Sequence, residues 1–295
     1  MKIEDAKITR RSFFKQIYKL GLGAVFITSI GFGYARYIEP RQLKITRYLL
    51  QSEKIPTSFD GIRIVLFSDT HIGFNYSADQ FSKLINRINE EAPDIIFFTG
   101  DLLDAPNKYK EIGKVTQLLK DLRAPLGKFS IYGNHDHGGY GSEIIKMIME
   151  EADFELLVNT NQKLYNKMND YIYISGLDDG MLGKPDPVKA LQKVEKDVYT
   201  IFLAHQPDLV KSIGDLPVDL QLSGHSHGGQ IQLPFIGPIF TPYGATTYFE
   251  GFYQVGSTQL YVNRGIGTTR VPFRFLSPPE LTIFTLKPLK GRSVE

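Results

Sequence analysis

The sequence has 295 residues, 42% of them hydrophobic and none of them cysteine, which argues against a disordered chain and excludes disulfides and thiolate metal ligands. A metal site would have to use His, Asp, Glu and Asn, a donor set that favours Mn, Fe or Zn. The formal charge is +2, and residues 1–19 carry a net +4 from six basic and two acidic residues, which leaves −2 for the remainder. This mildly acidic remainder, which no biased linker interrupts, predicts one large domain for which no nucleic acid is expected as a partner.

The N-terminal segment predicts an export signal. Residues 9–15 read TRRSFFK and precede the uncharged apolar stretch Leu20–Ala35. Paired arginines before aromatic residues, followed by a short apolar stretch, resemble the bacterial twin-arginine signal. We expect residues 1–38 to be a twin-arginine signal peptide or an N-terminal anchor, residues 39–295 to be the folded domain, and the twin-arginine export machinery to be a partner.

Two fates of this segment stay open. Gly33 and Ala35 provide the small residues that a signal peptidase requires, whereas Tyr37 and Ile38 extend the apolar stretch toward the length of a membrane span. The expected location is therefore outside the cytoplasm, either anchored to the membrane or in the cell wall. The twin-arginine route carries folded proteins, which suits a metal site that forms only with the fold.

The first strong element of the domain follows a polar, Pro-containing stretch. Ile62–Phe67 is a nearly continuous apolar segment rich in β-branched residues, which is typical of a buried strand. Asp69 and His71 come just after it. Residues 77–94 then have apolar side chains at helical spacing, with Ser77 as the candidate N-cap, so the pattern is strand followed by helix.

A strand followed by polar residues recurs along the chain. Further strands are expected at Ile95–Thr99, at Phe129–Tyr132 and in the segments 199–204 and 218–223. The metal-competent residues that follow these strands are Asp101, Asn134, His135, His205, His225 and His227. Ligands of open α/β sheets collect beyond the carboxyl ends of the strands, so we expect these side chains to converge on one site. A single polar residue after a strand is usually a loop residue whose hydrogen bonds are satisfied locally. Five of the six histidines lie in such positions, and local loop roles do not explain so many.

Two of these histidines lie in the segment 223–230, SGHSHGGQ. A His-X-His pair in extended or turning backbone sends both imidazoles toward one side, which suits metal ligation, and the glycines allow a tight turn. The alternative is a glycine-rich surface turn with incidental histidines. The polar residues at the other strand ends favour the metal site.

Together these blocks resemble the calcineurin-like metallophosphoesterases. The resemblance rests on the patterns Asp-X-His, Gly-Asp-X-X-Asp, Gly-Asn-His-Asp, a lone His and Gly-His-X-His, in this order between about residues 60 and 230. Its polar members are Asp69, His71, Asp101, Asp104, Asn134, His135, Asp136, His205, His225 and His227. The C-terminal segment 260–286 is similar to the YkuE/YaeI-like branch of small exported or membrane-associated members.

The resemblance implies an α/β fold, a four-layer α-β-β-α sandwich of two mixed β-sheets, with two divalent metal ions, Mn, Zn or Fe. One metal would be held by Asp69, His71, Asp101 and His227, and the other by Asp101, Asn134, His205 and His225. Asp101 would bridge the two, because a carboxylate has two oxygens to offer. His135 would be the catalytic residue that protonates the leaving group or stabilises the transition state, with Asp136 or Asp104 orienting nearby groups.

The implied activity is hydrolysis of a phosphoester by a metallophosphoesterase, acting as a phosphodiesterase or phosphatase. The two metals would polarise the phosphoryl group and activate a water molecule for attack on phosphorus. The expected substrate is a phosphoester of an envelope lipid or a wall polymer. A nuclease on the same fold and a non-catalytic metal-binding scaffold are the alternatives.

Two features near the C-terminus allow two interpretations each. The segment 231–256, dense in aromatic residues, Pro and Gly, is expected to form β-hairpins that fill the second sheet, and the alternative is an apolar rim for a lipid-linked substrate. Arg264, Arg270 and Arg274 are candidates for bidentate contacts to phosphate, although structural or solvated arginines are more common.

Overall fold

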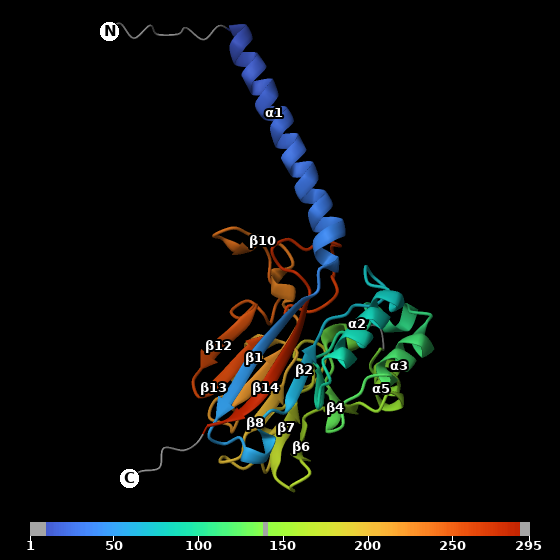
Figure 1. Cartoon of the computed structure of the whole chain (residues 1–295), viewed down its shortest axis with the longest axis vertical. Helices are drawn as coiled ribbons and strands as arrows, with labels where there is room; N and C mark the ends of the chain where they lie inside the picture. The colour runs from blue at the N-terminus through green and yellow to red at the C-terminus, as the bar shows by residue number, and fades with distance from the viewer. Residues whose placement is uncertain (1–9, 138–140, 290–295) are drawn as a thin grey trace, which may run out of the picture.

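A computed structural model describes residues 10–137 and 141–289, and it shows two β-sheets with one long helix, α1 (Arg10–Gly33), projecting from one end (Figure 1). Residues 1–9, where the predicted signal begins, and residues 290–295, where the predicted domain ends, lie outside the described residues. All five strands predicted beside polar residues are present.

The first sheet is mixed and has six strands. These are β1 (Lys44–Ser52), β2 (Arg63–Phe67), β3 (Ile95–Phe98), β4 (Gly127–Ser130), β5 (Glu155–Leu156) and β14 (Glu280–Pro288). In space they follow the order β1-β14-β2-β3-β4-β5. Strands β2 to β5 run parallel, β14 runs antiparallel to β2, and β1 pairs in parallel with β14, so the two ends of the domain meet at this edge.

The second sheet also has six strands. These are β6 (Thr160–Tyr165), β7 (Tyr171–Gly176), β8 (Thr200–Leu203), β9 (Leu220–Ser223), β12 (Gly251–Val255) and β13 (Thr258–Val262). Their order is β12-β13-β9-β8-β7-β6, with parallel pairing from β13 to β7 and antiparallel pairing at both edges.

Helices cover the outer faces of the sheets. Besides α1 the α-helices are α2 (Ala78–Glu90), α3 (Ile112–Lys120), α4 (Asn134–His137), α5 (Ser142–Glu151), α6 (Pro187–Ala190) and α7 (Val210–Ile213). A π-helix covers Tyr34–Ile38, and short 3-10 helices cover Glu39–Arg41, Thr57–Phe59, Pro106–Lys108, Pro207–Leu209 and His227–Gly229. Ser77 caps α2 as predicted, and Gln80 completes a capping box.

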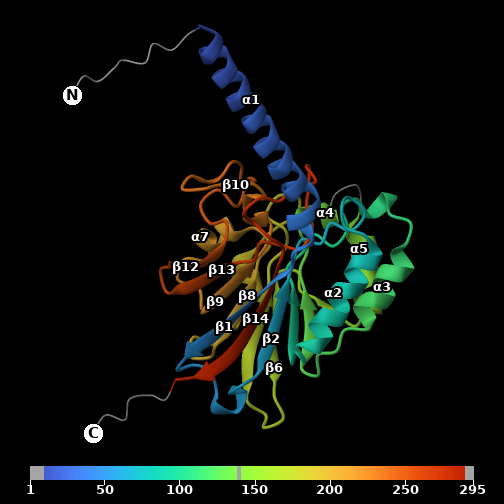
Figure 2. The ribbon, with the colours of Figure 1, turned by 45° about the horizontal axis from the view of Figure 1, so that its top comes forward.

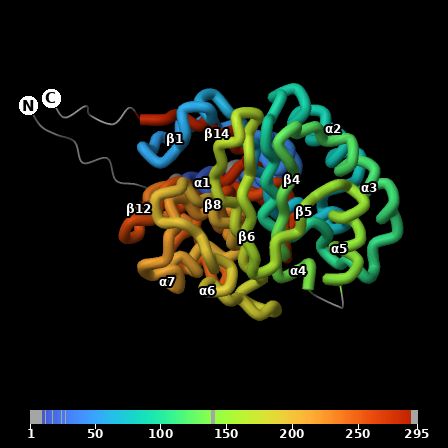
Figure 3. The backbone as a smooth tube through the Cα atoms, turned by 90° about the horizontal axis from the view of Figure 1, so that it is seen from below, coloured from blue at the N-terminus to red at the C-terminus, as the bar shows by residue number. Residues whose placement is uncertain are grey.

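The layers follow from the alternation of side chains along the strands. In β2, Ile64 and Leu66 pack against the second sheet, whereas Val65 and Phe67 pack against the cluster that contains α2. In β8, Phe202 packs toward α6 and α7 on the opposite outer face. Helices, sheet, sheet and helices thus form the predicted four-layer α-β-β-α sandwich (Figures 2 and 3). Because both faces of the central strands are covered, their sequences read as continuous apolar segments.

Sequence reasoning missed β1, which lies in the polar, Pro-containing stretch before Ile62–Phe67. This strand is at the edge of its sheet, and of its nine residues only Leu50 is buried. An edge strand whose side chains are exposed or half-buried has no continuous apolar segment that would reveal it.

The expectation that residues 231–256 fill the second sheet is wrong for most of that segment. Only β12 joins the sheet. The short strands β10 (Gln232–Leu233) and β11 (Gly237–Pro238) form a separate two-stranded ribbon. Pro234, Gly237 and Pro238 explain this in part, because proline cannot donate to a sheet ladder and glycine favours turns.

Candidate metal centre

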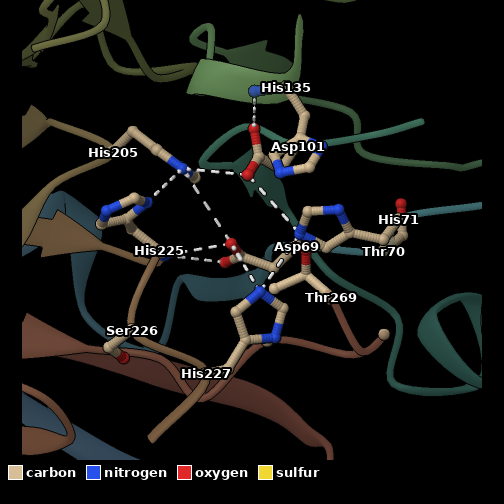
Figure 4. A network of polar contacts seen from close by, with 12 residues as sticks. Asp69, Thr70, His71, Asp101, His135, His205, His225, Ser226, His227 and Thr269 are labelled. Carbon is tan, nitrogen blue, oxygen red and sulfur yellow. Dashed lines mark hydrogen bonds and ion pairs between the residues drawn. The ribbon is translucent and has the colours of Figure 1, made fainter. Parts of the chain in front are cut away.

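Two groups of buried side chains meet where the carboxyl ends of strands from both sheets come together (Figure 4). The groups are Asp69, His71 and His227, and Asp101, His205 and His225. Within each group the candidate ligand atoms lie within 4.8 Å of one another. They belong to loops that follow β2, β3, β8 and β9, so the convergence expected from the sequence occurs, and it occurs between two sheets rather than along one.

Asp101 lies between the two groups. Its Oδ2 is 3.5 Å from Nε2 of His71 and 3.3 Å from Nε2 of His205. Asp69 also approaches both groups, because its Oδ1 is 3.5 Å from Nε2 of His227 and 4.0 Å from Nε2 of His205. A carboxylate with both groups within reach has the geometry that a bridging ligand needs.

The backbone of this centre adopts an uncommon conformation. Five of the candidate ligands have positive φ, namely Asp69 (53°), His71 (42°), Asp101 (60°), His225 (67°) and His227 (51°). A residue other than glycine in this region is uncommon, and the strain is kept only where the surrounding structure imposes it. Five such residues around one point indicate a site shaped for function.

Glycines allow the loops to approach one another closely. A Cβ on Gly133 would collide with the carboxylate of Asp101, and a Cβ on Gly224 would collide with Ser68 and Asp69. Gly224 comes directly before His225. The sequence predicted that glycines here allow a tight turn, and the structure shows that Gly224 also allows two loops to pack closely together.

Backbone carbonyls fix the tautomers of two histidines. The Nδ1–H of His205 donates to the carbonyl of Thr99 at 2.6 Å, and the Nε2–H of His225 donates to the carbonyl of Tyr243 at 2.8 Å. A carbonyl can only accept, so each imidazole must carry its proton on that nitrogen. The opposite nitrogens, Nε2 of His205 and Nδ1 of His225, lie 3.2 Å apart with their lone pairs available for a shared cation.

His135 lies at the edge of this centre beside His71, with ring centroids 4.5 Å apart. Its Nδ1–H donates to the backbone carbonyl of Asp104 at 2.8 Å. The carboxylate of Asp104 lies 3.4 Å from Nδ1 of His71 and 3.7 Å from Nδ1 of His135. Asp104 therefore orients the His135 ring through its backbone carbonyl, and its carboxylate lies close to both rings.

Asp136 positions the loops rather than facing the pocket. Its carboxylate accepts hydrogen bonds from the backbone N–H groups of Asp101, Leu102 and Gly133. Burial, and then the charge of Asp101, raise the pKa of Asp136 to about 7 despite these bonds. This side chain ties the loop after β3 to the loop after β4, which brings Asp101 and Asn134 to one place.

The electrostatics of the centre show why it needs positive charge. Asp69 and Asp101 are 0% and 2% exposed. Burial lowers the pKa of His205, but the charge and hydrogen bond of Asp101, together with the charges of Asp69 and Asp179, raise that pKa to about 10. Burial and the neighbouring His205 lower the pKa of His225 to about 4, and burial also holds the pKa of His227 well below its usual value. His225 and His227 are therefore neutral donors, and a divalent cation that displaced the extra proton of His205 would complete a donor set with the buried carboxylates.

Asn134 provides a direct test of whether a metal fits. Its Oδ1 is buried and has no hydrogen-bond partner among the described residues. Such an atom costs roughly 1–3 kcal/mol when it is left unpaired. Asn134 borders the same pocket as Asp101 and His225, so a cation bound by these groups would satisfy the oxygen. Nitrogen and oxygen donors without sulfur fit Mn, Fe or Zn, as expected from the composition.

The pocket also receives residues from the C-terminal part of the chain. Besides Asn134, His135 and the candidate ligands, its lining includes Gly229, Gln230, Phe240, Pro242, Thr269 and Arg270. All of the predicted site residues lie in this pocket or in the groups directly beneath it.

The three arginines have different positions. Arg274 is fully buried and donates to the carbonyls of Gly267 and Ser277, so it is structural. Arg264 lies 3.2 Å from the carboxylate of Glu280, which also makes it structural. Only Arg270 borders the pocket, where its guanidinium lies 5.3 Å from the ring centroid of Phe240. Arg270 is the one of the three that remains a candidate for contact with phosphate.

Sequence reasoning missed a polar layer behind His205. Asp179, which is fully buried, accepts a hydrogen bond from the side chain of Gln206, and Gln206 accepts one from the backbone of Gly180. In the same region His137 donates to Asp178 at 2.9 Å. The signal was present, because Asp178 and Asp179 follow β7 just as Asp69 follows β2.

Residues 62–229 match the calcineurin-like phosphoesterase family. The chain is 47% identical over 281 residues to the uncharacterised metallophosphoesterase YkuE of Bacillus subtilis, across 95% of this chain and 98% of that protein. It is 30% identical to the UDP-2,3-diacylglucosamine pyrophosphatase LpxG of Chlamydia muridarum, across 85% of this chain and 91% of that protein. It is also 30% identical to a transmembrane protein with a metallophosphoesterase domain from Danio rerio, across 90% of this chain and 62% of that protein. The chain therefore belongs to the calcineurin-like phosphoesterases, a family of metal-dependent phosphoester hydrolases.

Proposed function

We propose that this chain hydrolyses a phosphoester at a two-metal centre and is held outside the cytoplasm by its N-terminal helix. The observation that carries the proposal is the pair of buried His and Asp groups that share Asp101. One cation would be held by Asp69, His71, Asp101 and His227. The other would be held by Asp101, Asn134, His205 and His225.

Divalent cations bound there would withdraw charge from the phosphoryl oxygens and activate water for attack on phosphorus. His135 would then act on the departing oxygen. Because the carbonyl of Asp104 holds its Nδ1–H, Nε2 is the atom that exchanges a proton with the leaving group. Burial lowers the pKa of His135, but the charge of Asp101, the carbonyl of Asp104 and the charges of Asp104 and Asp136 together hold that pKa above its ordinary value. This favours the protonated ring, which a general acid requires.

The mouth of the pocket supports a lipid-linked substrate. Phe240 and Pro242 provide apolar surface beside Arg270, the one guanidinium that borders the pocket among the described residues. An apolar rim with one cation suits an anionic phosphate attached to a hydrophobic group. Similarity to LpxG, whose name describes a pyrophosphatase of a diacylated sugar nucleotide, supports the same class. We therefore place a phosphoester of an envelope lipid before a wall polymer.

The N-terminal helix supports location at a membrane. The helical segment 13–41 is long and apolar enough to cross a bilayer, and α1 has 24 residues, about 36 Å at 1.5 Å per residue. Basic residues lie at its N-terminal end, among them Arg10, Arg11, Lys15 and Lys19, as expected for a cytoplasmic end. Ala35 is buried, and its carbonyl accepts the backbone N–H of Arg274 at 3.0 Å. We propose that the segment stays attached as an anchor, because Ala35 is already part of the domain.

Hydrolysis of two model substrates tests the proposed activity. Metal-free protein is assayed with p-nitrophenyl phosphate and with bis-p-nitrophenyl phosphate after addition of Mn, Zn, Fe or Mg. We expect activity that appears only with added metal, and the preferred substrate distinguishes a phosphatase from a phosphodiesterase. Two bound metals without hydrolysis of either substrate would instead support the non-catalytic scaffold.

The nuclease alternative is tested by salt dependence. An enzyme that contacts several phosphates of duplex DNA loses affinity steeply, with log K falling by about 0.9 per contact per unit of log salt. We expect KM for a lipid phosphodiester to change little with ionic strength. Efficient cleavage of DNA with a steep salt slope would favour the nuclease.

A further inference from the structure

We propose that residues 231–243, which we call the apolar ribbon, insert into the interfacial layer of the bilayer that α1 crosses and so hold the mouth of the metal centre at the membrane surface. The inference rests on the proposed role of α1 as an anchor. It adds a second, independent contact with the membrane, made by the part of the chain that borders the pocket.

The apolar ribbon exposes large hydrophobic side chains that nothing in the described structure covers. The exposed fractions are 109% for Phe235, 76% for Ile236, 63% for Ile239, 56% for Phe240 and 78% for Tyr243. No Asp, Glu, Lys or Arg occurs from residue 231 to residue 249. A contiguous apolar surface of this kind on a folded domain marks contact with a membrane or a protein.

The apolar ribbon and α1 lie at the same end of the molecule, as Figures 1 and 2 show from two directions. The segment 273–275 links them. The backbone N–H of Gln232 donates to the carbonyl of Phe275 at 2.8 Å, and that of Arg274 donates to the carbonyl of Ala35 at 3.0 Å. The rings of Phe32 and Phe273 are 5.1 Å apart. These contacts fix the root of the ribbon beside the base of α1.

The contact between the apolar ribbon and the base of α1 favours a bilayer over other partners of the ribbon. If α1 spans the membrane, the base of α1 lies at the interface, and the ribbon beside it lies at the same depth. Tyr37 and Ile38, 58% and 49% exposed, continue the apolar surface at that level. Tyrosine and phenylalanine are suited to the interfacial layer. A wall polymer would instead need polar and charged contacts, and the ribbon has no charged side chain.

The apolar ribbon also forms part of the pocket. Phe240 and Pro242 line it, and the carbonyl of Tyr243 accepts the Nε2–H of His225 at 2.8 Å. A ribbon seated among the headgroups would therefore place the pocket at the depth where lipid phosphates lie. A substrate would then reach the metal centre without leaving the membrane.

Depth-dependent quenching tests this inference, and the absence of cysteine makes the labelling specific. The full chain carrying Ile236→Cys is labelled with an environment-sensitive fluorophore and reconstituted into phosphatidylcholine and phosphatidylglycerol vesicles that contain doxyl-labelled lipid. Matched variants carry Ile30→Cys in α1 and Met168→Cys in the turn between β6 and β7, at the opposite end of the molecule (Figure 1). Met168 is 77% exposed, as accessible to label as Ile236.

We expect doxyl lipid to quench the labels at positions 236 and 30 by about twofold or more and to leave the label at 168 unchanged. A quenched label at 30 with an unquenched label at 236 would overturn the inference and leave the anchor in place. Quenching at neither position would overturn both. Hydrolysis of bis-p-nitrophenyl phosphate by the same labelled samples reports the metal centre separately, so loss of membrane contact is not confused with loss of catalysis.

A double variant, Phe235→Ser with Ile236→Ser, checks the cause of insertion. With the reporter cysteine placed at Ile239, quenching should fall toward the level seen at position 168, because the two apolar side chains at the turn provide the transfer free energy. Unchanged quenching at 239 would show that the ribbon is only carried near the membrane by α1, which contradicts a contact of its own.

Discussion

The metal centre and the membrane end of the molecule, formed by α1 and the apolar ribbon, depart from the usual rule of burial in opposite ways. The metal centre buries carboxylates, with Asp69 0% and Asp101 2% exposed, whereas the ribbon exposes Phe235 at 109%. Each arrangement is unfavourable in free energy for the chain alone in water. A buried charge is stabilised only by an opposite charge, and an exposed apolar surface only by contact with another apolar surface. Each departure therefore points to the partner that would offset its cost, cations at the metal centre and lipid at the apolar ribbon.

The largest effect should come from removing the charge that the two groups share. Asp101→Asn keeps the shape of the side chain but removes a bridging carboxylate, so metal content should fall below two per chain and kcat for a diester should fall by about 10³-fold or more. Elemental analysis and steady-state kinetics measure both. Asp215→Asn, at an exposed position, is the control. Full metal content in the Asp101 variant would show that this residue does not hold the two groups together.

Removing His135 should separate catalysis from metal binding. His135→Ala should retain both metals while kcat falls by about 100-fold for substrates with poor leaving groups, because a general acid acts on the departing oxygen. Substrates with good leaving groups should be affected less, since they need little protonation. An equal loss for both classes of leaving group, or loss of metal, would contradict the assigned role.

Export of the membrane end is tested by a substitution that keeps the charge of its N-terminal segment. Replacing Arg10 and Arg11 with lysine should leave most of the protein in the cytoplasm, because the export machinery recognises the arginine pair and not the net charge. Cell fractionation with detection of the full-length chain measures this and also shows whether the anchor is retained. Normal export of the lysine variant would remove the twin-arginine interpretation and leave a general signal or anchor.

The smallest effect concerns the pair of His137 and Asp178 beside the metal centre. The hydrogen bond to Asp178 raises the pKa of His137 above its ordinary value, which is near 6.5. The pair therefore contributes its full stability below that ordinary pKa and loses it as pH rises through the raised one. His137→Ala should lower the free energy of unfolding by about 1 kcal/mol at pH 6 and by less at pH 9. A difference from wild type that does not depend on pH would show that the pair is not ionised.

The sequence predicts the central strands and the candidate ligands well, for a physical reason. The segments around Ile64 and Phe97 are buried on both faces, so they read as continuous apolar segments, and polar residues directly after them have few other roles. The edge strand β1 and the apolar ribbon have no such pattern, since their side chains are mostly exposed or half-buried. The contacts that orient His205 and His225 come from the carbonyls of Thr99 and Tyr243, and carbonyls have no sequence signature.

The structural role of Arg274 was equally hard to predict. Its side chain is fully buried and bonds to carbonyls of the loop 264–277, next to the base of α1. From sequence alone, structural or solvated arginines were the more common expectation, but nothing distinguished Arg274 from Arg270. Only the fold shows that Arg274 holds this loop while Arg270 faces the pocket.

Anomalous diffraction from crystals of the full chain loaded with Mn would show whether Asp101 joins two metals, because it locates each metal without reference to activity. We expect two peaks on either side of the Asp101 carboxylate, one beside Asp69, His71 and His227 and the other beside Asn134, His205 and His225. A single peak, or peaks away from Asp101, would contradict the two-metal centre.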